Sequence, residues 1–370
     1  MPRKESDLLG ELILDDDVLW GIQTERAKRN FLVTGYPVQW PLLRALAQVK
    51  SACALANCET GHLPEAICNA IQNATSEVIA GEHLDAFPID ALQGGAGTST
   101  NMNMNEVLAR RASELSGQTI SPHDHVNLHQ STNDTFITAL KVAACQEIQT
   151  LELAVVDLLE SLQAKEREFA DVVKLGRTQL NDAVPVTLGR EFGAYSSAIA
   201  RDRWRLSKCT ERLREINLGG TAVGTGIAAP RRYIFCATEK LRELTGLGLA
   251  RAENLIDATQ NLDPLVEVSG ILRAHAANVV KIARDLRLMA SGPVGGLGEI
   301  NLPAMQPGSS LMPGKVNPVI PEMVIQAGFR VMAHDHEINL AVMSGDLELN
   351  AFGPLIADGL LQIVQILTHV

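Results

Sequence analysis

The groups best suited to chemistry stand close together in residues 306–318, which read Gln-Pro-Gly-Ser-Ser-Leu-Met-Pro-Gly-Lys-Val-Asn-Pro. Lys315 and Asn317 can bind a carboxylate, and the hydroxyl of Ser309 or Ser310 can transfer a proton where its alkoxide is stabilised. The spacing does not decide between the two serines. Because Gly, Ser and Pro recur here between two helical stretches, we interpret the segment as a long functional loop or lid.

A second polar segment, residues 93–103, reads Gln-Gly-Gly-Ala-Gly-Thr-Ser-Thr-Asn-Met-Asn. Its glycines let the backbone approach a ligand, and Thr98 and Ser99 offer hydroxyl groups without charge. A polar loop or a helix N-cap explains the same residues equally well.

Residues 123–134 lie just before a long helical stretch. Ser131, Thr132 and Asn133 at a helix start can hold a carboxylate, because free backbone N–H groups and the helix dipole favour anions there. Plain capping by Asn133 or Asp134 is the alternative. The segment also contains three histidines, but no Cys or carboxylate partner stands at a recognised spacing, so we predict no metal.

A fourth segment, residues 176–185, has the composition of a turn. Thr178 and Gln179 can hydrogen-bond a substrate. A helix–helix turn capped by Asp182 is the simpler interpretation of the same residues.

The elements that must position these segments are helices. Two stretches keep one apolar face over many turns: the first runs from Leu140 to Phe169, and the second from Asp263-Pro264 to Met289. Further helical patterns cover residues 186–216, 234–244 and 320–343, whereas few segments alternate like strands. The predicted fold class is all-α, a long-helix bundle with a smaller, mostly helical N-terminal domain.

Shorter helical pieces at 42–57 and 64–79, broken by Gly, Pro and polar loops, indicate a leading domain of residues 1–130. Residues 131–370 then form the central helical-bundle domain. The apolar run from Leu360 to Val370 meets no Gly, Asn or Pro that would end a helix, so we expect a bundle helix cut before its end.

Composition narrows the class of protein. The 370 residues include 32 Lys and Arg against 43 Asp and Glu, a net charge of −11, with no basic block, which argues against nucleic acid or anionic membranes as partners. No secretory signal is recognisable and no apolar run approaches the roughly 20 residues that span a bilayer. We interpret the six sparse cysteines as reduced thiols and therefore expect a cytoplasmic protein. The charge and composition together favour a small molecule as its ligand or substrate.

Together these segments resemble the aspartase/fumarase superfamily, because residues 308–318 match its signature loop almost letter for letter. Residues 93–99 look like the aspartate ammonia-lyase form. Gln179 also favours the ammonia-lyase form over a fumarase. Fumarases carry a His at this position, paired with a Glu, and this chain keeps only the Glu, as Glu322. The resemblance covers nearly the whole chain and includes Gly10-Glu-Leu, Trp20-Gly-Ile-Gln-Thr24 and Asn217-Leu-Gly-Gly-Thr221.

The resemblance implies a homotetramer in which each active site is built from three subunits. It implies anti β-elimination of ammonia from the dicarboxylate L-aspartate, through an aci-carboxylate, to fumarate, without metal or organic cofactor. The signature-loop serine falls on Ser309 as the base, with Ser310 beside it still a candidate, and Lys315 and Asn317 bind the carboxylate. The other residues implied at the site are Thr98, Ser99, Ser131, Thr132, Asn133, Thr178, Gln179 and Glu322.

Some features depart from the family pattern. Asn181, Arg190, His129 and Ala228 replace residues that are usual there. Family members continue into a small C-terminal domain, which we expect to be absent here. Two other functions stay open: a class II fumarase that interconverts malate and fumarate, and a non-catalytic structural protein on the same fold, as in related lens crystallins.

Overall fold

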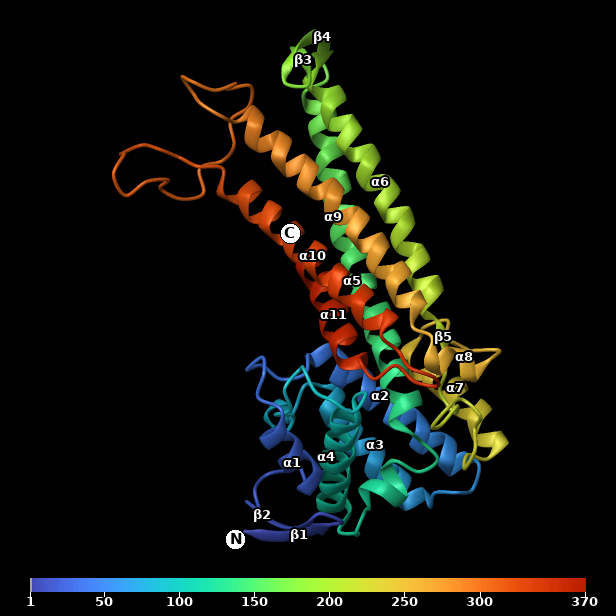
Figure 1. Ribbon diagram of the computed structural model, residues 1–370. Helices are drawn as coiled ribbons and strands as arrows, with labels where there is room; N and C mark the ends of the chain where they lie inside the picture. Colours follow the sequence, from blue (N-terminus) through green and yellow to red (C-terminus); the bar gives the residue numbers. More distant parts are fainter. Residues whose placement is uncertain (1) are drawn as a thin grey trace. The chain divides into compact units, whose positions relative to one another are not determined.

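The structure, a computed structural model, describes residues 2–370 (Figure 1). Helices dominate it, and the strands among these residues form three two-stranded sheets. The described chain divides into two compact units. Unit 1 comprises residues 2–147, 210–266 and 337–361, and unit 2 comprises residues 148–209, 267–336 and 362–370.

Unit 1 is helical, with an antiparallel hairpin near its start. Its elements are β1 (Arg3–Asp7), β2 (Gly10–Leu14), α1 (Ile22–Asn30), α2 (Trp40–Glu59), α3 (Glu65–Ile79), η1 (Leu84–Ala86), α4 (Thr98–Ser116), the short π-helix η2 (Pro122–Val126), β5 (Glu215–Ile216), α7 (Arg231–Thr245), β6 (Ala250–Arg251) and α8 (Leu255–Gln260). Helix α2 packs against α3 and α7, and α3 packs against α4. Fully buried Leu46, Ile71, Met104 and Leu108 build this core.

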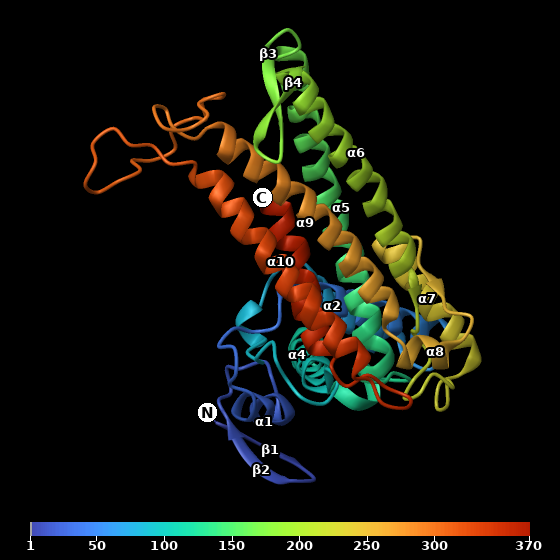
Figure 2. The same ribbon diagram turned by 45° about the horizontal axis from the view of Figure 1, so that its top comes forward.

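Unit 2 is built mainly from long helices, most of which begin or end in unit 1. They are α5 (Thr132–Glu168), α6 (Leu188–Leu213), α9 (Asp263–Met289), α10 (Val319–Met343) and α11 (Gly353–His369), with the hairpin β3 (Val173–Thr178) and β4 (Asn181–Thr187) between α5 and α6. Within unit 2, α5, α6 and α9 run side by side in both views, and the loop between α9 and α10 extends beyond their ends (Figures 1 and 2).

Buried polar bonds hold the helices of unit 2 together. The Asp202 carboxylate on α6 lies 3.0 Å from the His275 Nδ1 of α9 and accepts hydrogen bonds from Asn278 Nδ2. The Asp335 carboxylate on α10 accepts hydrogen bonds from Ser269 Oγ at 2.5 Å and from Arg273 Nη1 at 2.6 Å. These charged groups need such partners because an unpaired buried charge is costly.

Most of the predicted helices are confirmed. Helix α9 begins at Asp263, as its cap and proline predicted, and α11 contains the apolar C-terminal run. Helix α5 begins at Thr132, at the helix start predicted for residues 131–133 and before the apolar pattern that begins at Leu140. The prediction for residues 186–216 was too long, since α6 covers only 188–213 and strands β4 and β5 flank it.

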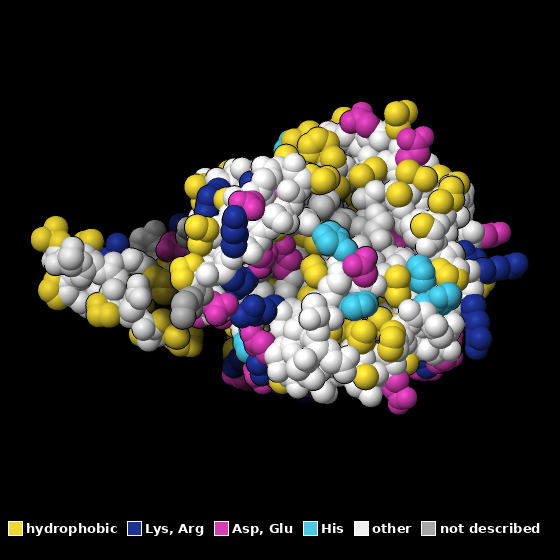
Figure 3. Space-filling view, turned by 90° about the horizontal axis from the view of Figure 1, so that it is seen from below, with side chains coloured by type: hydrophobic (Ala, Val, Ile, Leu, Met, Phe, Trp, Pro, Cys, Tyr) yellow, Lys and Arg dark blue, Asp and Glu magenta, His cyan; other side chains and the backbone are white. Residues whose placement is uncertain are grey.

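No helix within residues 2–370 is long and apolar enough to cross a membrane. On the face drawn in Figure 3, Lys and Arg side chains are interspersed with Asp and Glu, so the described residues of that face form no continuous basic patch. Of the six cysteines, all of them free thiols, four are buried.

Candidate active site

Two hydrogen bonds between its ends close the predicted signature loop; we call the residues that form them, Gly308, Lys315 and Asn317, the neck of the loop. The Gly308 N–H donates to the Lys315 carbonyl at 2.8 Å, and the Asn317 Nδ2 donates to the Gly308 carbonyl at 2.7 Å. A Cβ atom at position 308 would lie 2.8 Å from the Lys315 carbonyl oxygen, so only glycine fits there. The neck therefore fixes both ends of the segment that carries the two serines.

The structure distinguishes Ser309 from Ser310. The Ser309 Oγ accepts hydrogen bonds from the backbone N–H groups of Leu311 at 3.1 Å and Met312 at 2.9 Å. Ser309 is half-buried, whereas Ser310 is exposed. Two amide donors aimed at one oxygen stabilise negative charge on it, as in an oxyanion hole. Such an environment favours an alkoxide at Ser309.

Further predicted residues meet at a cleft of about 1200 Å³ in unit 2. Lys315, Asn317 and Glu322 line it, together with Leu180 from the β3–β4 hairpin. Glu322 lies in the first turn of α10 and forms an ion pair with Arg287, with 3.3 Å between Oε1 and Nε. The cleft thus collects an ammonium, an amide and a carboxylate from the loop and from α10.

Thr178 and Gln179 lie at a β-hairpin, so the interpretation of residues 176–185 as a helix–helix turn was wrong. Thr178 pairs with Asn181, and the two residues between them, Gln179 and Leu180, have φ angles of 54° and 64°. Positive φ at both central positions is the signature of a tight type I′ turn, which usually contains Asn or Gly. Gln179 is therefore presented, exposed, at the hairpin tip.

Ion pairs fix the base of the β3–β4 hairpin. Lys174 Nζ lies 2.6 Å from a Glu299 carboxylate oxygen and 2.9 Å from Glu191, and Arg177 also pairs with Glu299. Although burial opposes it, Lys174 and Arg177 hold the pKa of Glu299 below its usual value. Glu299 thus joins the hairpin to the chain that leads into the signature loop.

In unit 1, Thr98 and Ser99 form the first turn of α4. Gly97, with a φ of 89°, precedes them, and a Cβ atom there would lie 2.4 Å from the Phe136 ring. The Gln93 Oε1 accepts hydrogen bonds from both the N–H and the hydroxyl of Thr100, which caps this turn. The helix-start interpretation of the segment is therefore confirmed, and Thr98 is exposed in this first turn.

Ser131, Thr132 and Asn133 lie at the start of α5. The Ser131 Oγ accepts a hydrogen bond from the Asn133 N–H at 3.2 Å, and the Asp134 carboxylate accepts one from the Ser131 N–H at 3.0 Å. Capping is therefore present and involves Asp134, as the alternative held, but its other partner is Ser131, because the Asn133 side chain donates to the Ala222 carbonyl. Thr135 Oγ1 lies 3.3 Å from Asn101 Oδ1 of α4, which links the two helix starts within unit 1.

The three histidines of residues 123–129 take separate partners. His123 Nε2 lies 3.0 Å from the side-chain amide of Gln23, His125 Nδ1 accepts a hydrogen bond from the Ser121 N–H, and His129 Nδ1 lies 2.7 Å from the Asn57 side chain. Each ring is thus engaged in its own hydrogen bond.

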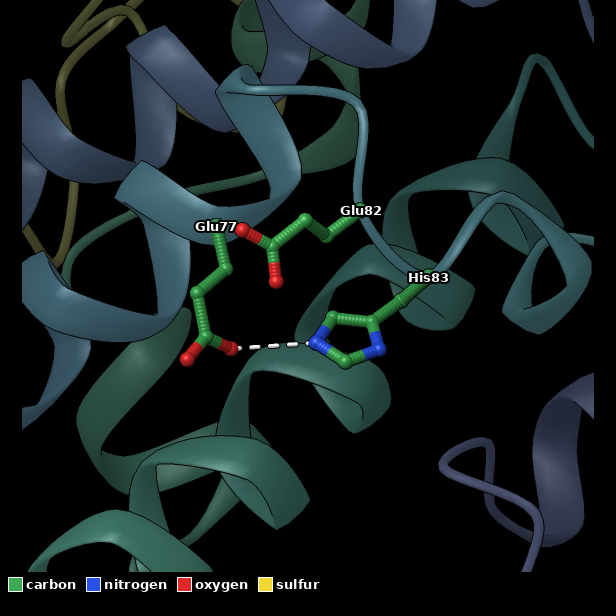
Figure 4. A group of neighbouring side chains, drawn as sticks. All are labelled: Glu77, Glu82 and His83. Carbon is green, nitrogen blue, oxygen red and sulfur yellow. Dashed lines mark hydrogen bonds and ion pairs between the residues drawn. The ribbon is translucent and has the colours of Figure 1, made fainter.

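Three side chains of types that can bind a metal ion, Glu77, Glu82 and His83, lie close together elsewhere in the described residues (Figure 4). His83 Nε2 lies 3.0 Å from Glu77 Oε2. Arg111 donates to both oxygens of Glu77, at 2.6 and 3.0 Å, and lowers the pKa of that carboxyl group. Because the guanidinium already neutralises Glu77, we interpret the group as an ion-pair network.

The sequence predictions missed one charged residue near the start of α5. Lys50, on α2, is fully buried and donates hydrogen bonds to Asn127 and Gln130, just before Ser131. The only signal in the sequence is a single lysine within the apolar run of residues 42–57.

A sequence profile of a family described as lyase matches residues 10–333. The chain belongs to this lyase family. The aspartate ammonia-lyase of Bacillus subtilis (strain 168) is 47% identical over 373 residues, which cover 99% of this chain and 78% of that protein. The resemblance to the aspartase/fumarase superfamily, on the aspartate ammonia-lyase side, is thereby confirmed.

Solved structures support the same family. A Brucella melitensis protein described as fumarate lyase:delta crystallin bound to cobalt is 46% identical, with a TM-score of 0.97 over 100% of this chain and 82% of that one. The class II fumarase of Schistosoma mansoni is 35% identical, with a TM-score of 0.96, and the match covers 100% of this chain and 82% of the fumarase. The predicted all-α, long-helix bundle of this lyase family is confirmed.

Proposed function

We propose that this protein is an aspartate ammonia-lyase, which removes ammonia from L-aspartate by anti β-elimination and forms fumarate. Membership of the lyase family and the 47% identity to an enzyme of that name support the proposal. The single structural observation that carries it is the pair of amide donors on Ser309 Oγ, beside Lys315 and Asn317 in one loop.

The proposed chemistry requires a stabilised base and a stabilised anion. The β-proton of aspartate is very weakly acidic, because its removal creates an aci-carboxylate with doubled negative charge. The Leu311 and Met312 N–H groups lower the cost of forming the Ser309 alkoxide, which then takes the β-proton. The electron pair of the broken C–H bond forms the double bond of fumarate as the Cα–N bond breaks, and the nitrogen leaves with the pair of that bond as ammonia. The Lys315 ammonium and a donor of Asn317 hold the carboxylate on which the charge develops.

The remaining site residues supply uncharged donors. In the proposal, the first turn of α4 and the start of α5 bind the substrate carboxylates through hydroxyls, an amide and helix N-terminal N–H groups. Gln179, at the hairpin tip, replaces a side chain that could activate water. The uncharged residues in this set are Thr98, Ser99, Ser131, Thr132, Asn133, Thr178 and Gln179. Glu322, a carboxylate, completes the proposed site residues.

We further propose a homotetramer in which three subunits contribute to each site. Large apolar side chains are exposed on α9 and α10 of unit 2, including Leu288, Ile320, Met323 and Phe329, and such side chains gain stability where a partner subunit covers them. Sedimentation should give a mass four times the chain's 39.9 kDa. A monomer that produces fumarate would refute the shared site.

The decisive variants are Ser309→Ala and the matched control Ser310→Ala. Removing a general base typically lowers kcat by about 10²–10⁴-fold, so we expect that loss for Ser309→Ala and less than about tenfold for Ser310→Ala. Fumarate formation from L-aspartate is followed by its ultraviolet absorbance. The reverse order of the two losses would transfer the role of base to Ser310, and equal activity of both variants and the parent would refute a serine base.

A further inference from the structure

Lys50 is unusual because its ammonium group is fully buried and both of its hydrogen-bond partners are neutral. The side chain is fully buried on α2, and its Nζ donates hydrogen bonds to Asn127 Oδ1 at 3.0 Å and Gln130 Oε1 at 2.9 Å. Both partners are uncharged amides, and burial lowers the pKa of Lys50 to about 7. An apolar side chain would fill the same space without the cost of desolvating an ammonium group. The lysine therefore stands where folding alone does not call for one.

The two amide partners of Lys50 belong to a larger network. Asn127 Oδ1 also accepts hydrogen bonds from Asn101 Nδ2 at 3.3 Å and from Asn105 Nδ2 at 3.1 Å, both on α4. Asn127 Nδ2 in turn donates to the Gln130 carbonyl at 3.3 Å. A single ammonium group thus joins α2 and α4 to the chain that enters α5.

Asp134 fixes the start of α5 as well. Its fully buried carboxylate accepts hydrogen bonds from the N–H groups of Ser131 at 3.0 Å, Gly219 at 3.1 Å and Thr221 at 3.0 Å. Residues 131–133 are therefore preceded in the chain by the two amides that bind Lys50 and followed by Asp134, and each of these buried groups has its own set of hydrogen bonds. Hydrogen bonds before and after a short segment leave it little freedom to move.

We propose that Lys50 is a positioning residue for substrate binding: through Asn127 and Gln130 it sets the conformation of residues 131–133, which bind a carboxylate of the substrate. The inference rests on the proposed function of that segment. Lys50 itself does not touch the substrate, because it is fully buried. Its removal should therefore weaken binding of the ground state and the transition state alike, which raises KM more than it lowers kcat.

The test compares Lys50→Met with Lys141→Met. Lys141 is a second buried lysine of unit 1; it lies within α5 itself and donates to the Glu215 carbonyl at 2.7 Å, not to residues 127–134. We expect Lys50→Met to raise KM for L-aspartate, and the dissociation constant of the dicarboxylate succinate, by at least about tenfold, with kcat lowered less than about threefold. Lys141→Met should leave both constants within about twofold of the parent.

Two results would overturn the proposal: an unchanged KM in Lys50→Met, or an equal rise in Lys141→Met. If Lys50→Met does not fold, Gln130→Met removes one acceptor and keeps the charge; a KM rise of about threefold or more supports the proposal, and an unchanged KM overturns it. Calorimetry with succinate separates this inference from the proposed function. Succinate binding that is lost only in Lys50→Met supports the positioning role even if the parent makes no fumarate.

Discussion

Gly97 offers a sharp test of how the start of α4 is packed. It adopts a φ of 89°, and a Cβ atom added there would lie 2.4 to 2.7 Å from three carbons of the Phe136 ring. Phe136 is buried, with 1% of its surface exposed, so the ring has no free space to move into. Gly97→Ala should therefore strain both the backbone and the core.

Gly117 supplies the matched control at the other end of the same helix. Its φ is 69°, but nothing lies within 4 Å of the position that a Cβ atom would take. A left-handed conformation costs an alanine about 1–2 kcal/mol, and overpacking of a core adds about 1–3 kcal/mol. We therefore expect a loss of about 1–2 kcal/mol in the free energy of unfolding for Gly117→Ala and about 2–5 kcal/mol for Gly97→Ala.

The assay is urea unfolding of both variants and the parent at one protein concentration, followed by circular dichroism. The change from glycine to alanine affects the unfolded chain in the same way in both variants, so the difference between them reports the contact with Phe136. Equal urea midpoints for Gly97→Ala and Gly117→Ala would refute the reasoning. A Gly97→Ala protein as stable as the parent would refute the packing itself.

Three further predictions follow from single contacts. Folded Lys50 has a pKa of about 7, below the 10.5 of an unfolded lysine, so the unfolded chain binds the extra proton between these two values. The free energy of unfolding therefore falls as the pH is lowered towards 7. Relative to Lys50→Met, the parent should become more stable by about 2 kcal/mol between roughly pH 7 and pH 9, as measured by urea unfolding. Leu180 has a φ of 64°, so Leu180→Gly should relieve strain and raise the thermal midpoint, with a gain of about 1 kcal/mol; a lower midpoint would contradict the type I′ turn. Asn317→Ala removes one of the two hydrogen bonds that close the neck of the signature loop, so proteolysis within residues 306–318 should become faster. An unchanged cleavage rate would contradict a stabilising role for this bond.

The helices were predictable where their apolar pattern and caps were plain, as at Asp263-Pro264 for α9. The start of α5 was indicated by the capping residues 131–134, whereas its apolar pattern begins only at Leu140, because buried polar residues occupy the first turns: Thr132, Asp134, Thr135 and Thr138 are all buried there. A pattern based on apolar side chains reads such a stretch as a loop.

The hairpin of residues 173–187 escaped prediction for a different reason. Its strands have no buried apolar face: in β3 the apolar Val173 and Leu175 are exposed while Lys174 between them is half-buried, and most of β4 is exposed. Its turn carries Gln179 and Leu180 instead of Asn or Gly. The environment of Ser309 was equally hidden, because the donors on its hydroxyl are backbone N–H groups whose direction depends on the loop conformation. The residue types of the candidate site could be predicted, but the contacts that distinguish the two serines could not.

The most direct test of the account is the ultraviolet absorbance of fumarate after the purified protein is mixed with L-aspartate and, separately, with L-malate. Only an elimination creates the conjugated double bond of fumarate. The account predicts fumarate from L-aspartate, with release of ammonia, and none from L-malate. Fumarate from L-malate alone would make the protein a fumarase, and no fumarate from either substrate would contradict the proposed lyase reaction.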